Sequence, residues 1–364
     1  MKRFFIVAGD PSADRYSANL IREIKLRNPD TTFWGIGGEE MIKEGLISIA
    51  HISDVSVVGF WEVAKRYNFF KLLLKKSADI LKENNIDAFI PVDYPGFNIR
   101  LAKIANKNNI PVYYYIAPQL WAWGKNRAKE LQSIVEKLFV VFPFEAEYFS
   151  NFGINSIYLG HPILDNVEFN QEFKTYDQRN QNIAFFPGSR IQEVTKHIAL
   201  LKSILDINDK KHKYNFVIAK SSNIPLSAFE MIADYSNVEI SEDNIGIMQN
   251  SLAGIIKTGT SNLEAALCGL PFGMYYKTSF ITYKIAEKLV NLPYISIVNI
   301  LSNKFVVKEF IQKEANPVSI LDYISGLIKD RETYEGIQSQ FSELKELLGK
   351  GGATKKIAEE ILRN

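Results

Sequence analysis

Short apolar runs alternate with stretches of helical apolar spacing along nearly the whole chain. The runs are apolar on both faces, which is typical of buried strands in a parallel sheet covered by helices. The stretches between them repeat apolar residues three and four positions apart, as at Val194, Ile198 and Leu201. This pattern predicts an α/β fold with strands near residues 3–8, 32–36, 86–92, 111–116, 138–142, 157–160, 183–186, 214–219, 238–241, 254–256 and 272–276.

The alternation stops once, between residues 161 and 180, where the chain is polar and weakly periodic. A chain of 364 residues is also too long for one ordinary hydrophobic core. We therefore expect two domains, 1–165 and 180–345, each with a Rossmann-like parallel sheet, which bind ligands in a central cleft at the carboxyl ends of their strands. Beyond Lys304 the pattern is helical, and it leaves open whether a last helix in 346–364 crosses back to the first domain.

The composition is that of a globular protein without a strong charge. The net charge of +2 argues against a nucleic-acid partner. The single cysteine, Cys268, excludes an internal disulfide, and the four histidines lack the spacing of a metal site. The apolar run at 3–8 ends in a polar turn, so we expect a first strand there and not a signal peptide. No run has the length that crosses a bilayer.

A candidate phosphate site follows the apolar run at 183–186. Pro187 ends the run, Gly188 and Ser189 form a turn, and Arg190 opens a helical stretch. A strand, a glycine turn and a helix start aim free backbone N–H groups at an anion, and a guanidinium suits phosphate oxygens. The same local pattern also occurs in α/β proteins that bind nothing there.

A second loop of this kind covers residues 257–264. Gly259 and Thr260 follow a strand, and Glu264 lies one turn into the next helix, where its carboxylate is suited to hydrogen bonds from a ribose. The alternative is a helix start capped by Thr260 or Ser261, with Glu264 in a capping box. The loops around Arg190 and Glu264 would both face one nucleotide.

The chemistry of a general base is expected in the first half of the chain. Asp93 comes directly after an apolar strand, so its carboxylate would be partly desolvated. Asn98, which follows in the same segment, is a candidate substrate-binding residue. A plain Asp-x-Pro turn explains Asp93 equally well. Asp10 lies in the first polar loop, where the alternative is a turn capped by Ser12.

Two further stretches have aromatic residues beside basic ones. Trp121 and Trp123 precede Lys125 and Arg127 and are candidates for the wall of a sugar site, with core packing as the alternative. In the helical stretch 59–82, one stripe from Val63 through Tyr67 to Leu81 is assigned to the core. The opposite side suits an anionic membrane surface, a dimer interface or cover by another segment, and carries Trp61, Phe69, Leu72, Lys65, Lys75 and Lys76.

Taken in order, these motifs resemble the lipid-A-disaccharide synthase family, whose members are inverting glycosyltransferases of bacterial outer-membrane glycolipid assembly. The matching segments span most of the chain, and the ordered set is specific although each segment alone is weak. They are residues 8–14, 37–45, 58–63, 93–98, 118–123, 142–145, 160–162, 187–193, 259–265 and 294–301.

The resemblance implies a GT-B fold and transfer of 2,3-diacylglucosamine from its UDP derivative to 2,3-diacylglucosamine 1-phosphate, without a metal or other cofactor. It assigns proton removal from the acceptor 6-hydroxyl to Asp93 and makes Asp10 a functionally important acid. It also assigns a nucleotide site to Arg190, Glu264 and Asn299. The family acts at the cytoplasmic face of the inner membrane, which favours a membrane role for the 59–82 stretch. The oligomeric state stays open, a homo-oligomer included.

Several positions depart from the family pattern, and two other functions compete with it. Asp10 stands where Glu is usual, Gly96 where a second Asp is usual, and Gly124 where Arg follows the Trp pair. The nearest alternative is another GT-B enzyme, such as a UDP-sugar 2-epimerase or a glycosyltransferase with a soluble acceptor. A non-catalytic nucleotide-binding protein is the other. A nicotinamide oxidoreductase is disfavoured because the first strand lacks a G-x-G-x-x-G turn.

Overall fold

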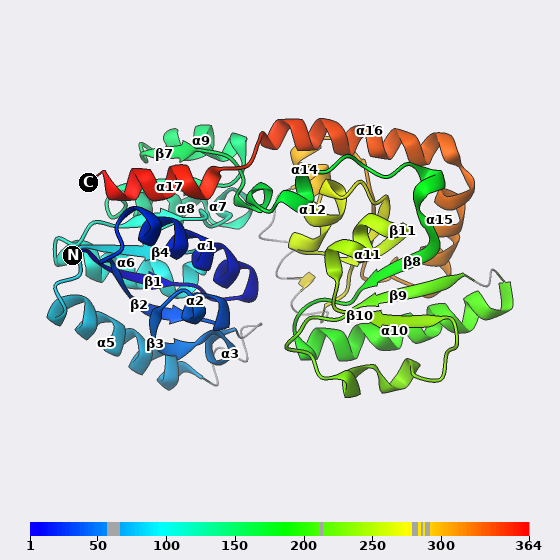
Figure 1. The fold of residues 1–364 in the computed structure, drawn as a ribbon, viewed down its shortest axis with the longest axis horizontal. Coiled ribbons are helices and arrows are strands. Elements are labelled where there is room, and N and C mark those ends of the chain that lie inside the picture. Colours follow the sequence, from blue (N-terminus) through cyan, green and yellow to red (C-terminus); the bar gives the residue numbers. More distant parts are fainter. Residues whose placement is uncertain (57–65, 212–213, 279–282, 285–286, 288–291, 364) are drawn as a thin grey trace. The chain divides into compact units, whose positions relative to one another are not determined.

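The computed structural model describes residues 1–56, 66–211, 214–278, 283–284, 287 and 292–363 (Figure 1). The side chains of residues 123, 125 and 126 lie outside this description. The chain divides into two compact units. Unit 1 contains Met1–Asn166 and Leu348–Asn364, and unit 2 contains Val167–Glu287 and Leu292–Leu347. Both units have parallel sheets, as the alternating pattern predicts.

The sheet of unit 1 is parallel and is built around its first strand. The order β3-β2-β1-β4 continues into β5-β6-β7 through isolated bridges from Phe89 to Val112 and from Val92 to Tyr115. The chain adds strands on one side of β1 and then returns to add β4 on the other side. Such a switch point is where open parallel sheets bind ligands. The strands are β1 (Arg3–Val7), β2 (Thr32–Gly37), β3 (Leu46–His51), β4 (Ala88–Pro91), β5 (Tyr113–Tyr115), β6 (Lys137–Val140) and β7 (Ser156–Tyr158).

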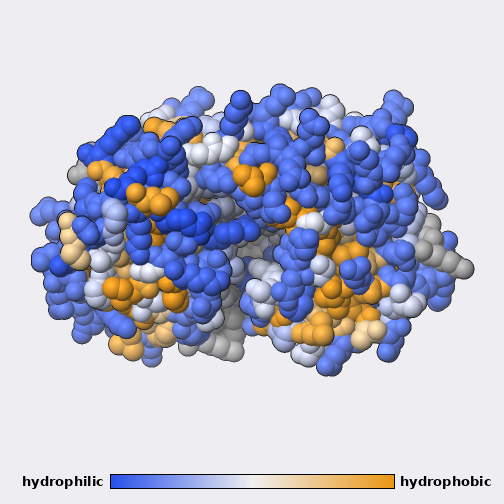
Figure 2. All heavy atoms as spheres, in the orientation of Figure 1, coloured by the Kyte–Doolittle hydropathy of each residue, from blue (hydrophilic) through white to orange (hydrophobic). Residues whose placement is uncertain are grey.

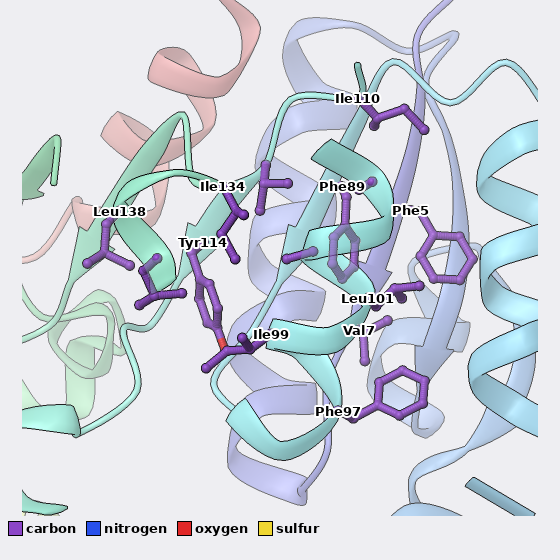
Figure 3. Packing of buried hydrophobic residues seen from close by; sticks show 14 of the residues in the cluster. Phe5, Val7, Phe89, Phe97, Ile99, Leu101, Ile110, Tyr114, Ile134 and Leu138 are labelled. Atoms are coloured by element: carbon purple, nitrogen blue, oxygen red, sulfur yellow. The ribbon is translucent and has the colours of Figure 1, made fainter. Parts of the chain in front are cut away.

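The core of unit 1 forms where α6 (Pro95–Lys107) packs against the sheet. Figure 3 shows Phe5, Phe89 and Tyr114 of the strands beside Ile99 and Leu101 of this helix, and all five side chains are buried. The other helices are α1 (Pro11–Arg27), α2 (Glu39–Lys43), α3 (Ile52–Val55), α5 (Tyr67–Glu83), α7 (Leu120–Trp123), α8 (Lys125–Gln132), α9 (Pro143–Ser150), η1 (Pro162–Asp165) and α17 (Ala353–Leu362).

The last helix, α17, is held within unit 1. Asp165 accepts hydrogen bonds from the first main-chain N–H groups of this helix, at 2.9 Å from both Ala353 and Thr354. Farther along, Glu360 pairs with Lys137 at 2.7 Å. A carboxylate at a helix N-terminus satisfies unpaired N–H groups and the helix dipole, so Asp165 fixes where this helix begins.

Unit 2 contains a six-stranded parallel sheet in the order β10-β9-β8-β11-β12-β13. Its switch point lies between β8 and β11. The strands are β8 (Asn180–Phe186), β9 (Asn215–Ala219), β10 (Val238–Ser241), β11 (Ser251–Lys257), β12 (Phe272–Tyr276) and β13 (Lys308–Ile311). The helices are η2 (Val167–Asn170), η3 (Tyr176–Gln178), α10 (Ile191–Lys211), η4 (Leu226–Ile232), α11 (Asn244–Asn250), α12 (Thr260–Leu267), α14 (Ile297–Ser302), α15 (Pro317–Lys329) and α16 (Arg331–Leu348).

Two strands lie where the apolar pattern did not predict them. The prediction of helix from Lys304 onward is wrong at β13, and β3 was not predicted. Each is at an edge of its sheet, where one side of the strand lacks a neighbour and an apolar run is not required. In β13, Glu309 is buried because its carboxylate accepts main-chain hydrogen bonds, so a charged residue stands at a core position.

Candidate active site

Asp93 directly follows β4, in a turn whose main chain is strained. Asp93 has φ 43° and Tyr94 has φ 49°, both in the left-handed region, which costs a non-glycine residue roughly 1–2 kcal/mol. Both main-chain polar groups of Asp93 are hydrogen-bonded. The Asp93 N–H donates to the carbonyls of Tyr115 and Ile116, each at 3.2 Å, and the Asp93 carbonyl accepts from the Tyr114 hydroxyl at 2.7 Å. Neighbouring strands therefore determine where the Asp93 carboxylate stands.

Asn98 supplies the remaining support of this turn. Its Nδ2 donates to the Asp93 carbonyl at 2.8 Å, to that of Val92 at 3.2 Å and to that of Val7 at 3.3 Å. The side chain is fully buried. The amide protons of Asn98 are thus used on the main chain at the ends of β1 and β4, which makes Asn98 a positioning residue for the turn. Its Oδ1 has no hydrogen-bond partner among the described residues, and direct contact of Asn98 with substrate stays a prediction.

The Asp93 side chain is half-buried and its pKa is raised to about 7. Loss of solvent is the largest cause and the charge of Asp10 the second; a hydrogen bond from the Tyr94 main chain opposes them, and the Glu145 charge adds to them. A general base works best when its pKa is near the operating pH. The carboxylate is thus reachable, fixed and suited to take a proton near neutrality.

Asp10 follows β1 in the loop that leads to α1, and it caps that helix. Its Oδ1 accepts from the Ala13 N–H at 2.9 Å, so the cap of α1 is Asp10, and the alternative of a Ser12 cap is wrong. β1 and β4 are paired, so Asp10 and Asp93 leave adjacent strands at the switch point. Between them Gly9 faces the Tyr94 ring, where an added Cβ would stand 2.4 Å from Cγ. A catalytic role of Asp10 itself stays a prediction.

Two buried carboxylates near this edge were missed from the sequence. Asp14 accepts from the main-chain N–H of Gly38 at 2.6 Å and of Glu40 at 3.1 Å, and so caps α2. Glu145 is fully buried and accepts from the Trp121 indole. The signal for Glu145 was its place three residues after Phe142, since a Glu at that helix position can accept from the main-chain N–H of the N-cap residue.

In unit 2, two helix starts lie at the switch point of the sheet. β8 leads through Gly188, Ser189 and Arg190 into α10, and β11 leads through Gly259 into α12. β8 and β11 are paired in register as far as Phe186 and Ile256, so both loops leave the same edge. The cap of α12 is Gly259, and the alternative of a Thr260 or Ser261 cap is wrong. Paired helix N-termini of this kind form an anion site.

Charges at this edge support an anion site. Lys257 Nζ lies 2.9 Å from Glu193 Oε1, and Arg190 Nη1 lies 3.6 Å from the same oxygen. Two cations thus share one carboxylate, which leaves a positive balance beside the helix starts. The Arg190 side chain is half-exposed, and its Nε has no hydrogen-bond partner among the described residues. A guanidinium in this position has donors left for phosphate oxygens.

Asn299 was expected to contact the nucleotide, and the structure corrects this. The residue is fully buried. Its Nδ2 donates to the Val307 carbonyl and to Glu309 Oε1, and its Oδ1 accepts from the N–H groups of Val306 and Val307, all at 2.9 Å. Every donor and acceptor of the amide is therefore used inside the protein, and Asn299 is a positioning residue.

The bonds of Asn299 continue toward the phosphate loop. Glu309 accepts from the Ser296 N–H at 2.9 Å, and the Ser296 hydroxyl donates to Asn262 Oδ1 at 3.4 Å. Asn262 Nδ2 in turn donates to the Lys257 carbonyl at 2.9 Å, two residues before Gly259. Asn299 thus supports the Gly259 turn through Glu309, Ser296 and Asn262.

The remaining predicted residues divide into two groups. Thr260 is exposed and Glu264 half-buried, both at the start of α12, so contact with a nucleotide stays a prediction for them. Trp61, Lys65 and the side chain of Trp123 lie outside the described residues. Among the described residues, His, Cys, Asp and Glu form no group of three suited to a metal ion.

Comparison with known proteins decides between the alternatives. A family model described as lipid-A-disaccharide synthetase matches residues 4–360. The chain belongs to the lipid-A-disaccharide synthase family. A lipid-A-disaccharide synthase of Trichlorobacter lovleyi is 34% identical, with 99% of this chain and 97% of that protein covered. One of Persephonella marina is 32% identical, with 99% and 98% covered.

Solved structures agree on the fold. A UDP-GlcNAc 2-epimerase from Neisseria meningitidis bound to UDP-GlcNAc superposes with a TM-score of 0.65, at 16% identity and full coverage of both chains. MurG of Acinetobacter baumannii superposes with a TM-score of 0.59 at 14% identity, also with full coverage of both chains. The fold is GT-B, as expected, and family membership makes the chain a glycosyltransferase and places it in lipid A biosynthesis rather than among the epimerases.

Proposed function

We propose that this lipid-A-disaccharide synthase transfers 2,3-diacylglucosamine from UDP-2,3-diacylglucosamine to 2,3-diacylglucosamine 1-phosphate. The products are the β-1,6-linked disaccharide 1-phosphate and UDP. The family match supports the reaction, and one structural observation carries the chemistry: a half-buried Asp93 with a pKa of about 7, fixed at the switch point of its sheet.

In the proposed step, Asp93 accepts the proton of the acceptor 6-hydroxyl. The freed oxygen forms a bond to the anomeric carbon of the donor while the bond from that carbon to the diphosphate oxygen breaks. The electron pair leaves with UDP. Arg190 and the N-termini of α10 and α12 stabilise the added negative charge, so the step needs no metal.

The test is incubation of the protein with the donor and the monosaccharide 1-phosphate, followed by mass analysis. We expect a tetraacyl disaccharide 1-phosphate and one UDP per product. A parallel incubation with UDP-GlcNAc alone tests for epimerisation by separating the two UDP-sugars. A new UDP-sugar in that arm, with no disaccharide in the first, would overturn the proposal.

We also propose that the protein works at the cytoplasmic face of the inner membrane, where an acylated substrate lies. The support is the outward side of α5, where Leu72 is 68% and Tyr67 60% exposed beside the exposed Lys71, Lys75 and Lys76. On the face drawn in Figure 2, apolar residues interrupt the hydrophilic surface of both units.

Two residues of α5 lie differently from the sequence prediction. Tyr67, which was predicted in the core stripe, is exposed, and Phe69, which was predicted on the outward side, is half-buried against the core. No helix of the described residues meets the length and apolarity of a membrane span.

Flotation with vesicles that contain anionic lipid tests this second proposal. Leu72→Ser should reduce the fraction that floats, and a Lys75→Glu change should reduce it further, since each lysine near an anionic surface contributes ~1 kcal/mol. Leu26→Ser is the matched control, because Leu26 is an exposed leucine of unit 1 on another helix. Parental protein that does not float, or equal flotation of all variants, would overturn the membrane role.

A further inference from the structure

Glu145 makes hydrogen bonds with both of its carboxylate oxygens at the carboxyl edge of unit 1. Its Oε2 accepts from the main-chain N–H of Val141 at 3.1 Å and of Phe142 at 3.0 Å, in the turn that joins β6 to α9. Its Oε1 accepts from the Trp121 indole Nε1 at 2.7 Å. Burying a carboxylate is costly unless its bonds are made, so this arrangement ties the Trp121 ring firmly to the β6 turn.

Trp121 belongs to α7, which follows β5, and β5 is the strand beside Asp93. The Asp93 N–H bonds to Tyr115 and Ile116, a few residues before Trp121. The indole is half-buried, and its ring meets the Phe144 ring edge-on at 5.1 Å between centroids. The turns after β4, β5 and β6 therefore bring the general base and an aromatic surface to one edge of the sheet.

The aromatic surface continues away from Trp121. Phe144 is 37% exposed and stacks on Phe142 at 6.1 Å, and Phe142 meets the His161 ring at 5.5 Å. Burial lowers the pKa of His161 to about 3, so this ring is neutral. Phe142 and His161 are buried and back this row, so its exposed part consists of Phe144 and the Trp121 indole. A neutral aromatic pair with its indole fixed by a carboxylate suits the apolar face of a sugar ring, as aromatic residues do in other ligand sites.

We propose that Glu145 is a positioning residue that holds the Trp121 indole as one wall of the acceptor-sugar site beside Asp93. This rests on the sugar acceptor proposed above. Gln cannot replace Glu145, because an amide has one accepting oxygen where a carboxylate has two. The NH2 of Gln would face either the indole N–H or the main-chain N–H groups, which are donors as well.

Glu145 also acts on Asp93 by its charge. Asp10 and Glu145 are the charged groups that raise the Asp93 pKa, while the Tyr114 hydroxyl bonds to the Asp93 carbonyl and not to its carboxylate. Removing the Glu145 charge should therefore lower the Asp93 pKa. Trp121→Phe keeps the Glu145 carboxylate and removes only the indole bond that lowers the Glu145 pKa, so it should change the Asp93 pKa less. This difference separates the two effects of Glu145.

The experiment compares Glu145→Gln and Trp121→Phe, with Glu147→Gln as control, since Glu147 is an exposed acid on the same helix. Initial rates are measured against acceptor at saturating donor. Both test variants should raise the acceptor KM about tenfold, the effect of ~1.4 kcal/mol, and leave UDP affinity within twofold. The rise of kcat/KM with pH should move to lower pH in Glu145→Gln, and by more than in Trp121→Phe. Glu147→Gln should match the parent.

The outcomes separate this inference from the proposed reaction. An active parent whose Trp121→Phe and Glu145→Gln variants keep the parental acceptor KM would overturn the inference only, even if both variants melt at a lower temperature. Calorimetric titration of acceptor into parent and Trp121→Phe gives the same comparison without turnover. A parent that binds no acceptor would overturn both proposals.

Discussion

The side-chain amide of Asn98 donates a 2.8 Å hydrogen bond to the main-chain carbonyl of Asp93. This bond connects the first turns of α6 to the strained turn after β4, so the helix holds its own preceding loop in place. Asp93, the proposed base, is therefore positioned through its main chain, while its carboxylate remains available for a substrate proton. Positioning of this kind is what allows one group to act as a base without reorganisation at each turnover.

Asn98→Ala should weaken both the fold and the reaction. It removes three bonds to carbonyls at the ends of β1 and β4, and unpaired buried polar groups cost ~1–3 kcal/mol each. We expect a lower urea midpoint, and a kcat that falls ~10²-fold because a 1 Å displacement of a catalytic group has such an effect. UDP affinity, which the proposed nucleotide site assigns to unit 2, should not change.

Asn108→Ala is the control for that change. Asn108 is an exposed asparagine at the opposite, C-terminal end of α6, and its side-chain amide donates to the Ile104 carbonyl at 2.7 Å. Its loss should leave kcat at the parental value. Equal kcat in Asn98→Ala and Asn108→Ala would show that the turn around Asp93 does not depend on the buried amide.

Arg190→Ala should weaken UDP binding by roughly 1.5–3 kcal/mol, the value of a hydrogen bond to a charged group, which is about 10- to 150-fold in Kd. The reason is that Arg190 is the half-exposed cation next to the helix starts of unit 2. Arg331→Ala, an exposed arginine paired with Asp177 and Glu335, is the control and should bind UDP normally. Isothermal titration gives both values; an unchanged Kd in Arg190→Ala would remove this residue from the nucleotide site.

The raised pKa of Asp93 predicts a specific dependence of stability on pH. The folded protein holds the proton up to about pH 7, whereas an unfolded Asp loses it near 3.8. The contribution of this group to stability is thus fully present below pH 3.8 and is lost as the pH rises through about 7. Glu145, whose pKa burial also raises to about 7, acts in the same direction.

Asp93→Asn removes the charge but keeps the size and the tolerance for a left-handed turn. We expect the variant to be more stable than the parent at pH 8, and the difference to shrink between pH 7 and pH 5. Urea midpoints at pH 5, 6.5 and 8 provide the measurement. A difference between variant and parent that is the same at all three values would mean that Asp93 is not desolvated.

The sequence predicted the elements that place the site but not the roles of its buried amides. Strand, glycine turn and helix start are local patterns, so the loops at Asp93, Arg190 and Gly259 could be located without a structure. Asn98 lies beside the Asp93 loop in the sequence, whereas Asn299 lies far from all three loops. At neither position does the local sequence distinguish an amide that points outward from one that points inward. Their direction depends on carbonyls contributed by distant strands, such as Val7 for Asn98.

The residues that sequence reasoning missed are buried charges. Glu145 and Glu309 occupy core positions because main-chain N–H groups of neighbouring turns satisfy their carboxylates. An apolar pattern cannot reveal such positions, and at Glu309 it concealed the whole strand β13. The place of Glu145 in the first turn of α9, three residues after Phe142, was the one available signal.

The most direct test of the account is turnover and UDP affinity of Asp93→Asn, measured beside Asp93→Ala. If Asp93 removes the acceptor proton, both variants should lose roughly 10²- to 10⁴-fold in kcat, the usual contribution of a general base, and keep the parental Kd for UDP. Disaccharide formation at the parental rate by Asp93→Asn would contradict the account.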